Sequence, residues 1–356
     1  MKKQSKLQLA QQNTESAIKK TNEKICELGI RAGIMYESLV EIQTLFDCIR
    51  NIPSEEKIRY EKLKEQRMKW KQLTENFEIE YKKKEVTSTG SGVAGIGAGV
   101  AVATLGPSAA MGIATTFGVA STGTAISTLS GAAATNAALA WLGGGALAAG
   151  GGGMAAGKLL LFFAGPVGWS IAGVSLIASG IALTKAIGDK KRLENLFTLI
   201  STRDTKTYEL AIIELNERTI RMAKEMSNLN YACNRIRSFG TDYNSMTEQQ
   251  QFELGTYVNH MEASTMLLVN PIMGLTPKFT ESDYTKIGIK SKHKDIIISL
   301  ANMLYKIEFD EKDKKLLHKT LRKNKEFLSS ISIAKEDFTI ELFDIAEMAL
   351  KKKYQA

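Results

Sequence analysis

Residues 15–50 read ESAIKKTNEKICELGIRAGIMYESLVEIQTLFDCIR, and the spacing of apolar side chains in this stretch sets the class of the fold. The apolar positions recur seven apart and then alternately three and four apart: Ile18, Ile25, Leu28, Ala32, Met35, Leu39, Ile42, Phe46 and Ile49. That spacing places them on one narrow stripe of an α-helix. Pro53 ends the pattern, because a proline inside a helix removes a backbone donor and clashes with the preceding turn. We therefore predict a long amphipathic helix here.

The same spacing returns later in the chain. It joins Ile212, Leu215, Thr219, Met222, Met226, Leu229, Cys233 and Ile236. These residues lie in a predicted helix from about residue 189 to 239, which Gly240 ends. The first helix is expected to form a hairpin with a less regular helix over residues 54–85, and the two long stripes can pair with each other. A coiled coil between separate chains is the alternative.

Residues 241–356 are expected to form a compact helical module. Ser245 and Glu248 fit a capping box, which opens a helix over residues 247–268 that Asn270-Pro271 ends. Further helices are predicted over residues 293–309, 313–330 and 335–353, and only residues 284–289 suggest a short strand. The predicted fold class is all-α, with a long amphipathic bundle or coiled-coil stalk, an inserted apolar hairpin and this C-terminal helical module.

The segment between the two long helices is almost uncharged. Residues 86–184 hold one formal charge, Lys158, in 99 positions, and 22 of the 29 glycines. Within it, residues 159–183 form an uncharged run that is followed by Lys185, Lys190, Lys191 and Arg192. An apolar run of this length with a basic border is typical of a membrane span.

The chain is thus expected to have four parts. They are an N-terminal helical hairpin (1–85), the Gly/Ala-rich membrane-active segment (86–184), a long heptad helix (185–240) and the C-terminal module (241–356). The net charge of +9 is spread evenly, because residues 1–85 carry 18 basic and 14 acidic side chains and residues 185–356 carry 28 and 24. Nucleic-acid-binding proteins concentrate basic charge in a patch, so no nucleic-acid partner is predicted.

Small residues in the apolar segment suggest how its helices pack. Gly95 and Gly99 are four residues apart, as are Gly153 and Gly157, and such faces let helix backbones approach closely in lipid. The residues predicted to contact lipid are Leu161, Phe162, Phe163, Trp169 and Ile177. The alternative is that the segment forms a glycine-rich packed core or a constitutive anchor.

Catalytic, cofactor and metal sites are not indicated by the sequence. Gly152, Gly157 and Lys158 match the spacing of a phosphate-binding loop, but Leu159 stands where a hydroxyl should bind magnesium. The three histidines, His260, His293 and His318, lie in separate predicted helices without a metal-ligand spacing. We therefore expect a protein that is not an enzyme.

Three cysteines, an odd number, predict a chain made in a reducing cytoplasm rather than a disulfide-bonded one. The first residues show no apolar core of a signal peptide, so the protein is expected to reach the inner membrane through its internal segment or to stay soluble until triggered. Basic residues at both borders favour two crossings, with both flanks on the cytoplasmic side.

Two resemblances follow from these patterns. The order of long amphipathic helices around an apolar hairpin, over residues 15–240, is similar to the helical-bundle cytolysins, which are α-helical pore-forming toxins. Residues 118–157, GVASTGTAISTLSGAAATNAALAWLGGGALAAGGGGMAAG, resemble the glycine-zipper segment of many uncharacterised bacterial proteins and of some toxins. The resemblance to the cytolysins implies a shielded hydrophobic hairpin that is released onto a membrane, after which the long helices line a pore. The glycine-zipper resemblance implies membrane association.

The expected function is therefore that of a membrane-inserting effector that permeabilises a bilayer, as a toxin or in antiviral defence. Its expected partners are lipid and, when inserted, further copies of itself. The alternative is a membrane-anchored adaptor that recruits a protein partner through its C-terminal helices.

Overall fold

The computed structural model describes residues 5–68, 187–270, 272–275, 278–279, 281–323, 328 and 333–355. All regular elements in these ranges are helices, which confirms the all-α class. Residues 86–184 lie outside the described ranges. The residues predicted for packing and lipid contact lie there too: Gly95, Gly99, Gly153, Gly157, Leu161, Phe162, Phe163, Trp169 and Ile177.

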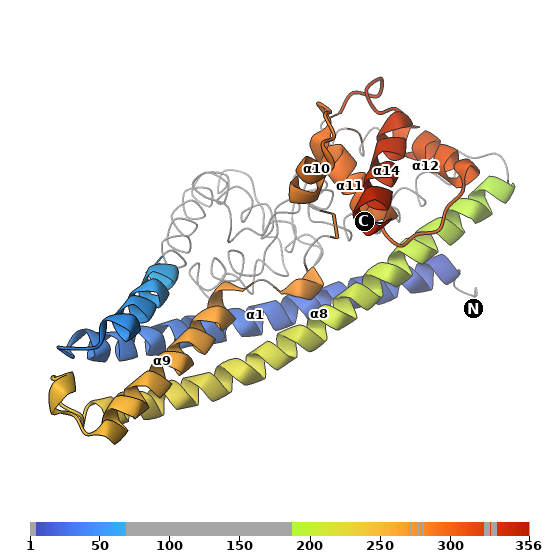
Figure 1. Ribbon diagram of the computed structural model, residues 1–356. Helices are drawn as coiled ribbons and strands as arrows, with labels where there is room; N and C mark the ends of the chain where they lie inside the picture. Colours follow the sequence, from blue (N-terminus) through green and yellow to red (C-terminus); the bar gives the residue numbers. More distant parts are fainter. Residues whose placement is uncertain are drawn as a thin grey trace, which may run out of the picture.

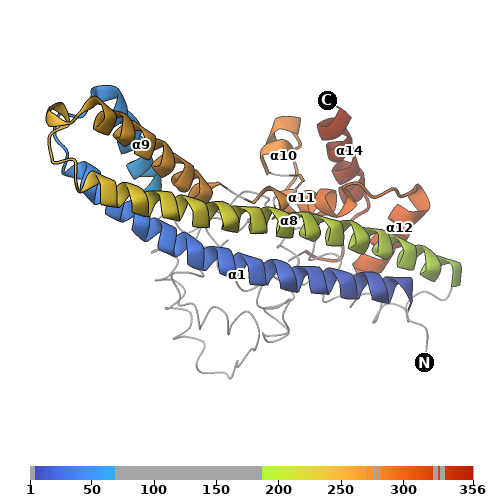
Figure 2. The same cartoon turned by 90° about the horizontal axis from the view of Figure 1, so that it is seen from below.

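Two long helices, α1 (Lys6–Asp47) and α8 (Ile187–Ile236), lie side by side and run in the same direction (Figures 1 and 2). Near their starts, the Thr14 hydroxyl lies 3.0 Å from the Ser201 carbonyl oxygen. Just past their ends, the Arg50 N–H donates to the Thr241 carbonyl at 2.9 Å. At a rise of 1.5 Å per residue, α1 is about 63 Å long. We call this parallel pair the shaft.

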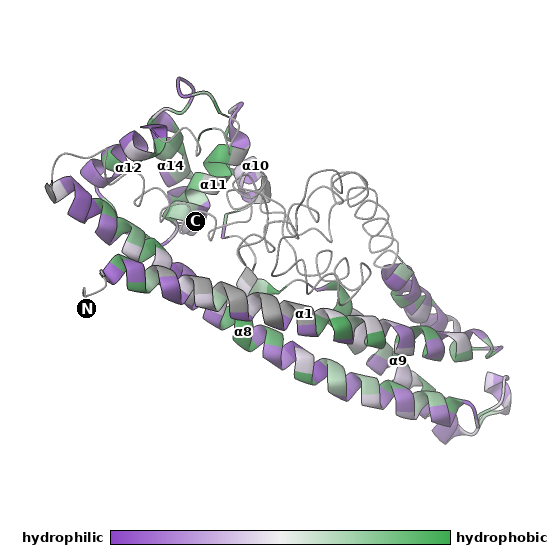
Figure 3. Ribbon diagram, turned by 180° about the vertical axis from the view of Figure 1, so that it is seen from behind, coloured by the Kyte–Doolittle hydropathy of each residue, from purple (hydrophilic) through white to green (hydrophobic). Residues whose placement is uncertain are grey.

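The shaft is held together by the two heptad stripes. Thr14 and Ser201 are 187 positions apart. The same offset aligns three buried residues of α1 (Leu28, Met35 and Ile42), and Ile49 just after its end, with four buried residues of α8 (Leu215, Met222, Leu229 and Ile236). Along both helices hydrophilic and hydrophobic residues alternate, whereas α11 is mostly hydrophobic (Figure 3). The heptad layers of α1 and α8 are thus in register, as in a parallel coiled coil.

α1 begins nine residues earlier than predicted. Ser5 caps it, because its hydroxyl accepts from the Gln8 N–H at 3.2 Å while the Gln8 side chain accepts from the Ser5 N–H at 3.0 Å. In the added turns, residues 6–14, two of the buried residues are small or polar: Ala10 and Thr14. A search for large apolar side chains therefore misses this part of the shaft.

At the far end of the shaft, α9 (Glu248–Val269) and the helix over residues 54–68 pack against α1 and α8. Tyr60 stacks on Phe46, and its hydroxyl donates to Asp47 at 2.6 Å. Arg67 is only 2% exposed, and its guanidinium donates to Gln43 at 2.8 Å and to Thr265 at 3.3 Å. Burial lowers the pKa of Arg67. A buried guanidinium held by neutral acceptors favours one arrangement of these helices more than it stabilises them.

The predicted capping box of α9 is wrong in its residues. Ser245 ends a short 3₁₀ helix, η3 (Tyr243–Ser245), and does not cap α9. Thr247 caps α9 instead and forms the box with Gln250, whose side chain accepts from the Thr247 N–H at 2.9 Å. Glutamine fills this position as well as glutamate does. The end of α9 at Asn270 agrees with the prediction.

The other end of the shaft carries C-terminal helices, of which the described residues form four. They are α10 (Glu281–Ile287), α11 (Lys294–Leu304), α12 (Glu311–Lys323) and α14 (Glu341–Gln355). The strand predicted over residues 284–289 is wrong, because residues 281–287 form α10, with Tyr284 buried and Ile287 packed on the same core. Side chains three residues apart share a helix face, and the segment was too short for its periodicity to be read. α11 ends earlier than predicted, and Lys306 after it has a positive φ of 54°.

We expect the shaft layers to dominate stability. Leu215→Ala removes a fully buried side chain and leaves a cavity at the α1–α8 contact, so we predict a loss of about 2–5 kcal/mol. Leu199→Ala, in the same helix at a half-exposed position, is the control and is predicted to cost about 0.5 kcal/mol. Urea unfolding followed by circular dichroism measures both. Equal losses would contradict the proposed layers.

Candidate functional site

α8 begins where the described chain resumes after residues 69–186, and its first turns hold the candidate site. Four apolar side chains there are buried in the core of the C-terminal helices: Leu193, Leu196, Phe197 and Ile200. Their spacing of three, one and three places them on one side of α8. The C-terminal helices therefore fix the point at which the chain enters α8.

Arg192 binds the N-terminus of α12. Its Nε donates to Asp313 at 2.7 Å, and its Nη2 donates to Asp310. The same two carboxylates close the first turn of α12, since the Asp313 N–H donates to Asp310 at 2.8 Å and the Asp310 N–H to Asp313 at 3.2 Å. Carboxylates are favoured at the positive end of a helix. The backbone of Asp313 and the guanidinium of Arg192 together lower the pKa of Asp310.

Arg203 makes the second polar contact between α8 and the C-terminal helices. Its Nη1 donates to the carbonyl oxygen of Met303 at 2.7 Å and to that of Tyr305. These carbonyls lie at the C-terminal end of α11, where the helix dipole favours a cation. The buried carboxylate of Asp204 accepts from Arg203 at 2.8 Å and holds the guanidinium in place.

We call this constellation the α8 anchor. It consists of Arg192 and Arg203, the carboxylates of Asp310 and Asp313, and the carbonyls of Met303 and Tyr305. The two arginines are 11 positions apart, about three helical turns, and so lie on the same side of α8. One reaches the start of α12 and the other the end of α11. The anchor therefore sets both the position and the rotation of α8 against these helices.

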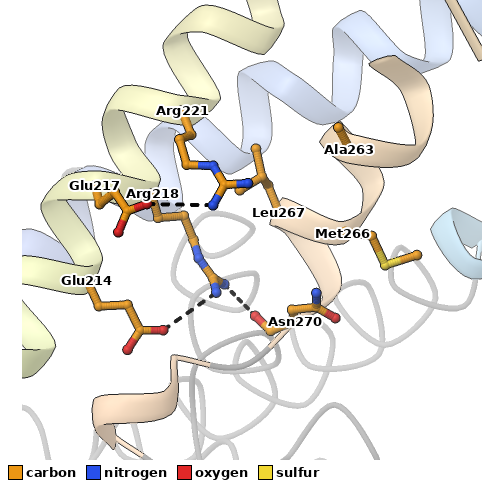
Figure 4. A pocket seen from close by; sticks show the side chains of 8 residues that line it. All are labelled: Glu214, Glu217, Arg218, Arg221, Ala263, Met266, Leu267 and Asn270. Carbon is orange, nitrogen blue, oxygen red and sulfur yellow. Dashed lines mark hydrogen bonds and ion pairs between the residues drawn. The ribbon is translucent and has the colours of Figure 1, made fainter. Parts of the chain in front are cut away.

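A cavity of about 260 Å³ lies between α8 and the end of α9 (Figure 4). Its lining residues are Glu214, Glu217, Arg218, Arg221, Ala263, Met266, Leu267 and Asn270. Arg218 donates to the Asn270 carbonyl and lies 3.8 Å from Glu214, while Arg221 lies 3.7 Å from Glu217 (Figure 4). Burial lowers the pKa of Arg218.

Glu214 connects this cavity to the short 3₁₀ helix η4 (Met273–Leu275). Its two carboxylate oxygens accept from the N–H groups of Met273 and Gly274, each at 2.9 Å. Gly274 lies so close to α8 that an added Cβ would be 2.8 Å from the Ala211 Cα. The charged groups of the cavity thus join α8 to the chain that follows α9, and their pairing indicates a structural junction rather than a catalytic centre.

Histidines do not form a metal site in the described part of the chain. His260 pairs with Glu225 at 2.8 Å, and His318 contacts the Phe338 carbonyl at 2.9 Å, in a different core. Among the residues that the structure describes, no group of three or more histidine, cysteine, aspartate or glutamate side chains is arranged to hold a metal ion. Nor is any helix within those residues both long and apolar enough to cross a bilayer.

Sequence reasoning treated Arg192 as part of a basic border and missed Arg203 altogether. The structure instead places Arg192 on the capping carboxylates of α12. Two signals pointed to this role: an Asp-x-x-Asp cap at the start of a predicted helix, and two arginines spaced to share a helix face.

Comparison with protein-family models, curated proteins and solved structures gives no match.

The α8 anchor is expected to show a defined pH dependence. Because the pKa of Asp310 is lowered in the folded protein, its carboxylate stabilises the fold above about pH 4 and loses this effect as the pH falls through its folded pKa. Asp310→Asn keeps a good helix cap but removes the charge. The gap between the melting temperatures of the variant and the wild type should narrow from about pH 5 to about pH 2.

The control for this experiment is Glu308→Gln, which removes a carboxylate from an exposed position two residues away. We expect it to keep the wild-type profile of melting temperature against pH. An Asp310→Asn profile parallel to that of the wild type would show that Asp310 does not contribute.

The close contact of η4 with α8 gives a second prediction. Gly274→Ala forces a Cβ against the backbone of Ala211, so we expect a loss of about 1–3 kcal/mol. Gly33→Ala is the control, because a Cβ at Gly33 has nothing within 4 Å and alanine favours a helix interior by about 1 kcal/mol. The midpoints of thermal and urea unfolding should therefore fall for Gly274→Ala and rise for Gly33→Ala.

Proposed function

We propose that this protein is a membrane-inserting effector whose segment 86–184 enters and permeabilises a bilayer. One observation carries the proposal: 99 consecutive residues hold a single formal charge, between helices in which charged residues are frequent. Leu161, Phe162, Phe163, Trp169 and Ile177 are the proposed lipid contacts. Gly95, Gly99, Gly153 and Gly157 are proposed to pack helices of neighbouring copies in the membrane.

The attachment points of the segment support this proposal. The helix over residues 54–68 runs back from the far end of the shaft, where Arg67 reaches Gln43 of α1. α8 begins at the opposite end. From the level of Gln43 to the start of the shaft is about 60 Å along the helix axis, roughly twice the thickness of a hydrocarbon core. The described chain therefore stops at residue 68 and resumes at Ile187 at different levels of the shaft, which supports a segment that faces a bilayer while the shaft stays folded.

The α8 anchor fixes the part of the chain that follows the segment. Charged and apolar contacts hold the first turns of α8 against the C-terminal helices. We propose that the folded shaft and these helices stay outside the bilayer on the cytoplasmic side, because both borders of the segment are basic.

A passive anchor is the second candidate. In that function the C-terminal helices recruit a protein partner to the membrane. It is favoured by the core that α10, α11, α12 and α14 form with the first turns of α8, and by Met348 and Tyr354, which are partly exposed on α14.

Liposome leakage separates the two functions. Purified protein is added to dye-loaded vesicles that contain anionic lipid, and both dye release and binding are measured. We expect release from the wild type and a loss of at least tenfold in release rate for Gly153→Leu with Gly157→Leu, because bulky side chains prevent close helix approach. Gly33→Leu, at an open position on α1, is the control and should release dye like the wild type.

Binding of the wild type without leakage would support the passive anchor. Absence of both binding and leakage would contradict membrane insertion. A double leucine variant that leaks like the wild type would show that the glycine faces are not used.

A further inference from the structure

The outer face of α8 carries large apolar side chains that the shaft does not cover. Leu210, Ile213 and Ile220 are 64%, 63% and 70% exposed. They point away from α1, because the stripe that packs on α1 contains Leu215 and Met222 instead, which are fully buried. Leu199, on the same side nearer the start of α8, is also half exposed, so the C-terminal helices leave this side of α8 open.

Charged residues frame this face in a self-complementary order. Lys206, Leu210, Ile213 and Glu217 follow each other at spacings of four, three and four. This spacing places all four on one stripe of α8. The order of spacings is the same from either end of the stripe. One end, Lys206, is positively charged, and the other end, Glu217, is negatively charged.

We propose that a second copy of this chain docks on this stripe, antiparallel to the first. A two-fold axis between Ala211 and Ile212 places Lys206 of each copy opposite Glu217 of the other, and Leu210 opposite Ile213. A parallel arrangement would instead place lysine against lysine and glutamate against glutamate, which is unfavourable. Charge complementarity therefore selects both the partner and its direction. An interface that is the same patch on both copies closes on itself and yields a dimer.

The contacts that Glu217 makes within its own chain are weak. It lies 3.7 Å from Arg221, and both side chains are about two-thirds exposed, where such a pair contributes little. Lys206 is likewise exposed. Both residues are therefore accessible to a partner. Ile220 lies almost one turn beyond Glu217, outside the symmetric stripe.

The proposed interface is short, so the dimer should be reversible. Stable interfaces bury about 1,200–2,000 Å² in total, whereas one pair of crossing helices buries less. We expect association in the micromolar range, measured in lipid-free buffer. The dimer does not depend on the proposed membrane function, because its residues lie on α8 and not in the segment 86–184.

Charge reversal tests the proposal. Sedimentation equilibrium over a concentration series should show a monomer–dimer equilibrium for the wild type. Lys206→Glu and Glu217→Lys should each weaken dimerisation roughly tenfold or more, since each creates two like-charge pairs across the interface. The double variant should restore it. An equimolar mixture of the two single variants should also form mixed dimers, because each supplies the charge that the other needs.

Lys319→Glu, an exposed reversal on α12, is the control and should dimerise like the wild type. Far-UV circular dichroism verifies that all variants keep their helix content. A wild type that stays monomeric overturns the proposal. So does dimerisation that survives both single reversals, which would assign the association to another surface, and so does a double variant that fails to recover.

Discussion

The arrangement of the other parts of the molecule depends on the parallel, in-register contact between α1 and α8. Antiparallel helices can follow each other through a short loop, but parallel neighbours need a long crossover connection. Here that connection starts after α1 and ends at Ile187, so it includes the apolar segment 86–184. The segment is thus placed in the very connection that the parallel contact requires. A change in the pairing of α1 with α8 would also change the distance between residue 68 and Ile187, where the described chain stops and resumes.

The two ends of the shaft are covered in different ways. At the far end, α9 and the helix over residues 54–68 add a mostly apolar core with a buried Arg67. At the start of α8, a second core is combined with the α8 anchor, in which arginines meet the capped start of one helix and the carbonyl end of another. Hydrophobic burial supplies most of the stability at both ends, while the charged contacts select one orientation.

Periodicity identified the parts of the fold that large apolar residues define. The stripes from Leu28 to Ile49 and from Leu215 to Ile236 are buried as their spacing predicts, with Met226 partly buried. Pro53, Gly240 and Asn270 lie just outside helices. Prediction failed where a helix was short or where its buried side chains were small. The sequence suggests only a short strand over residues 284–289 where α10 forms, because a helix of seven residues shows too little periodicity. The first turns of α1 were missed because alanine and threonine fill their buried positions. Of the α8 anchor, only Arg192 had been noted, as a border residue.

The sequence by itself determined that the chain is helical, where its long helices lie, and that one segment is almost without charge. These are local properties, since helix periodicity and capping depend on residues a few positions apart. Only the tertiary structure decided that α1 and α8 run in parallel and that Arg192 and Arg203 hold α8 to the C-terminal helices. The physical reason is that a heptad stripe can be buried equally well by a parallel and by an antiparallel partner helix. The direction is fixed by contacts such as that between Thr14 and Ser201, which join residues 187 positions apart.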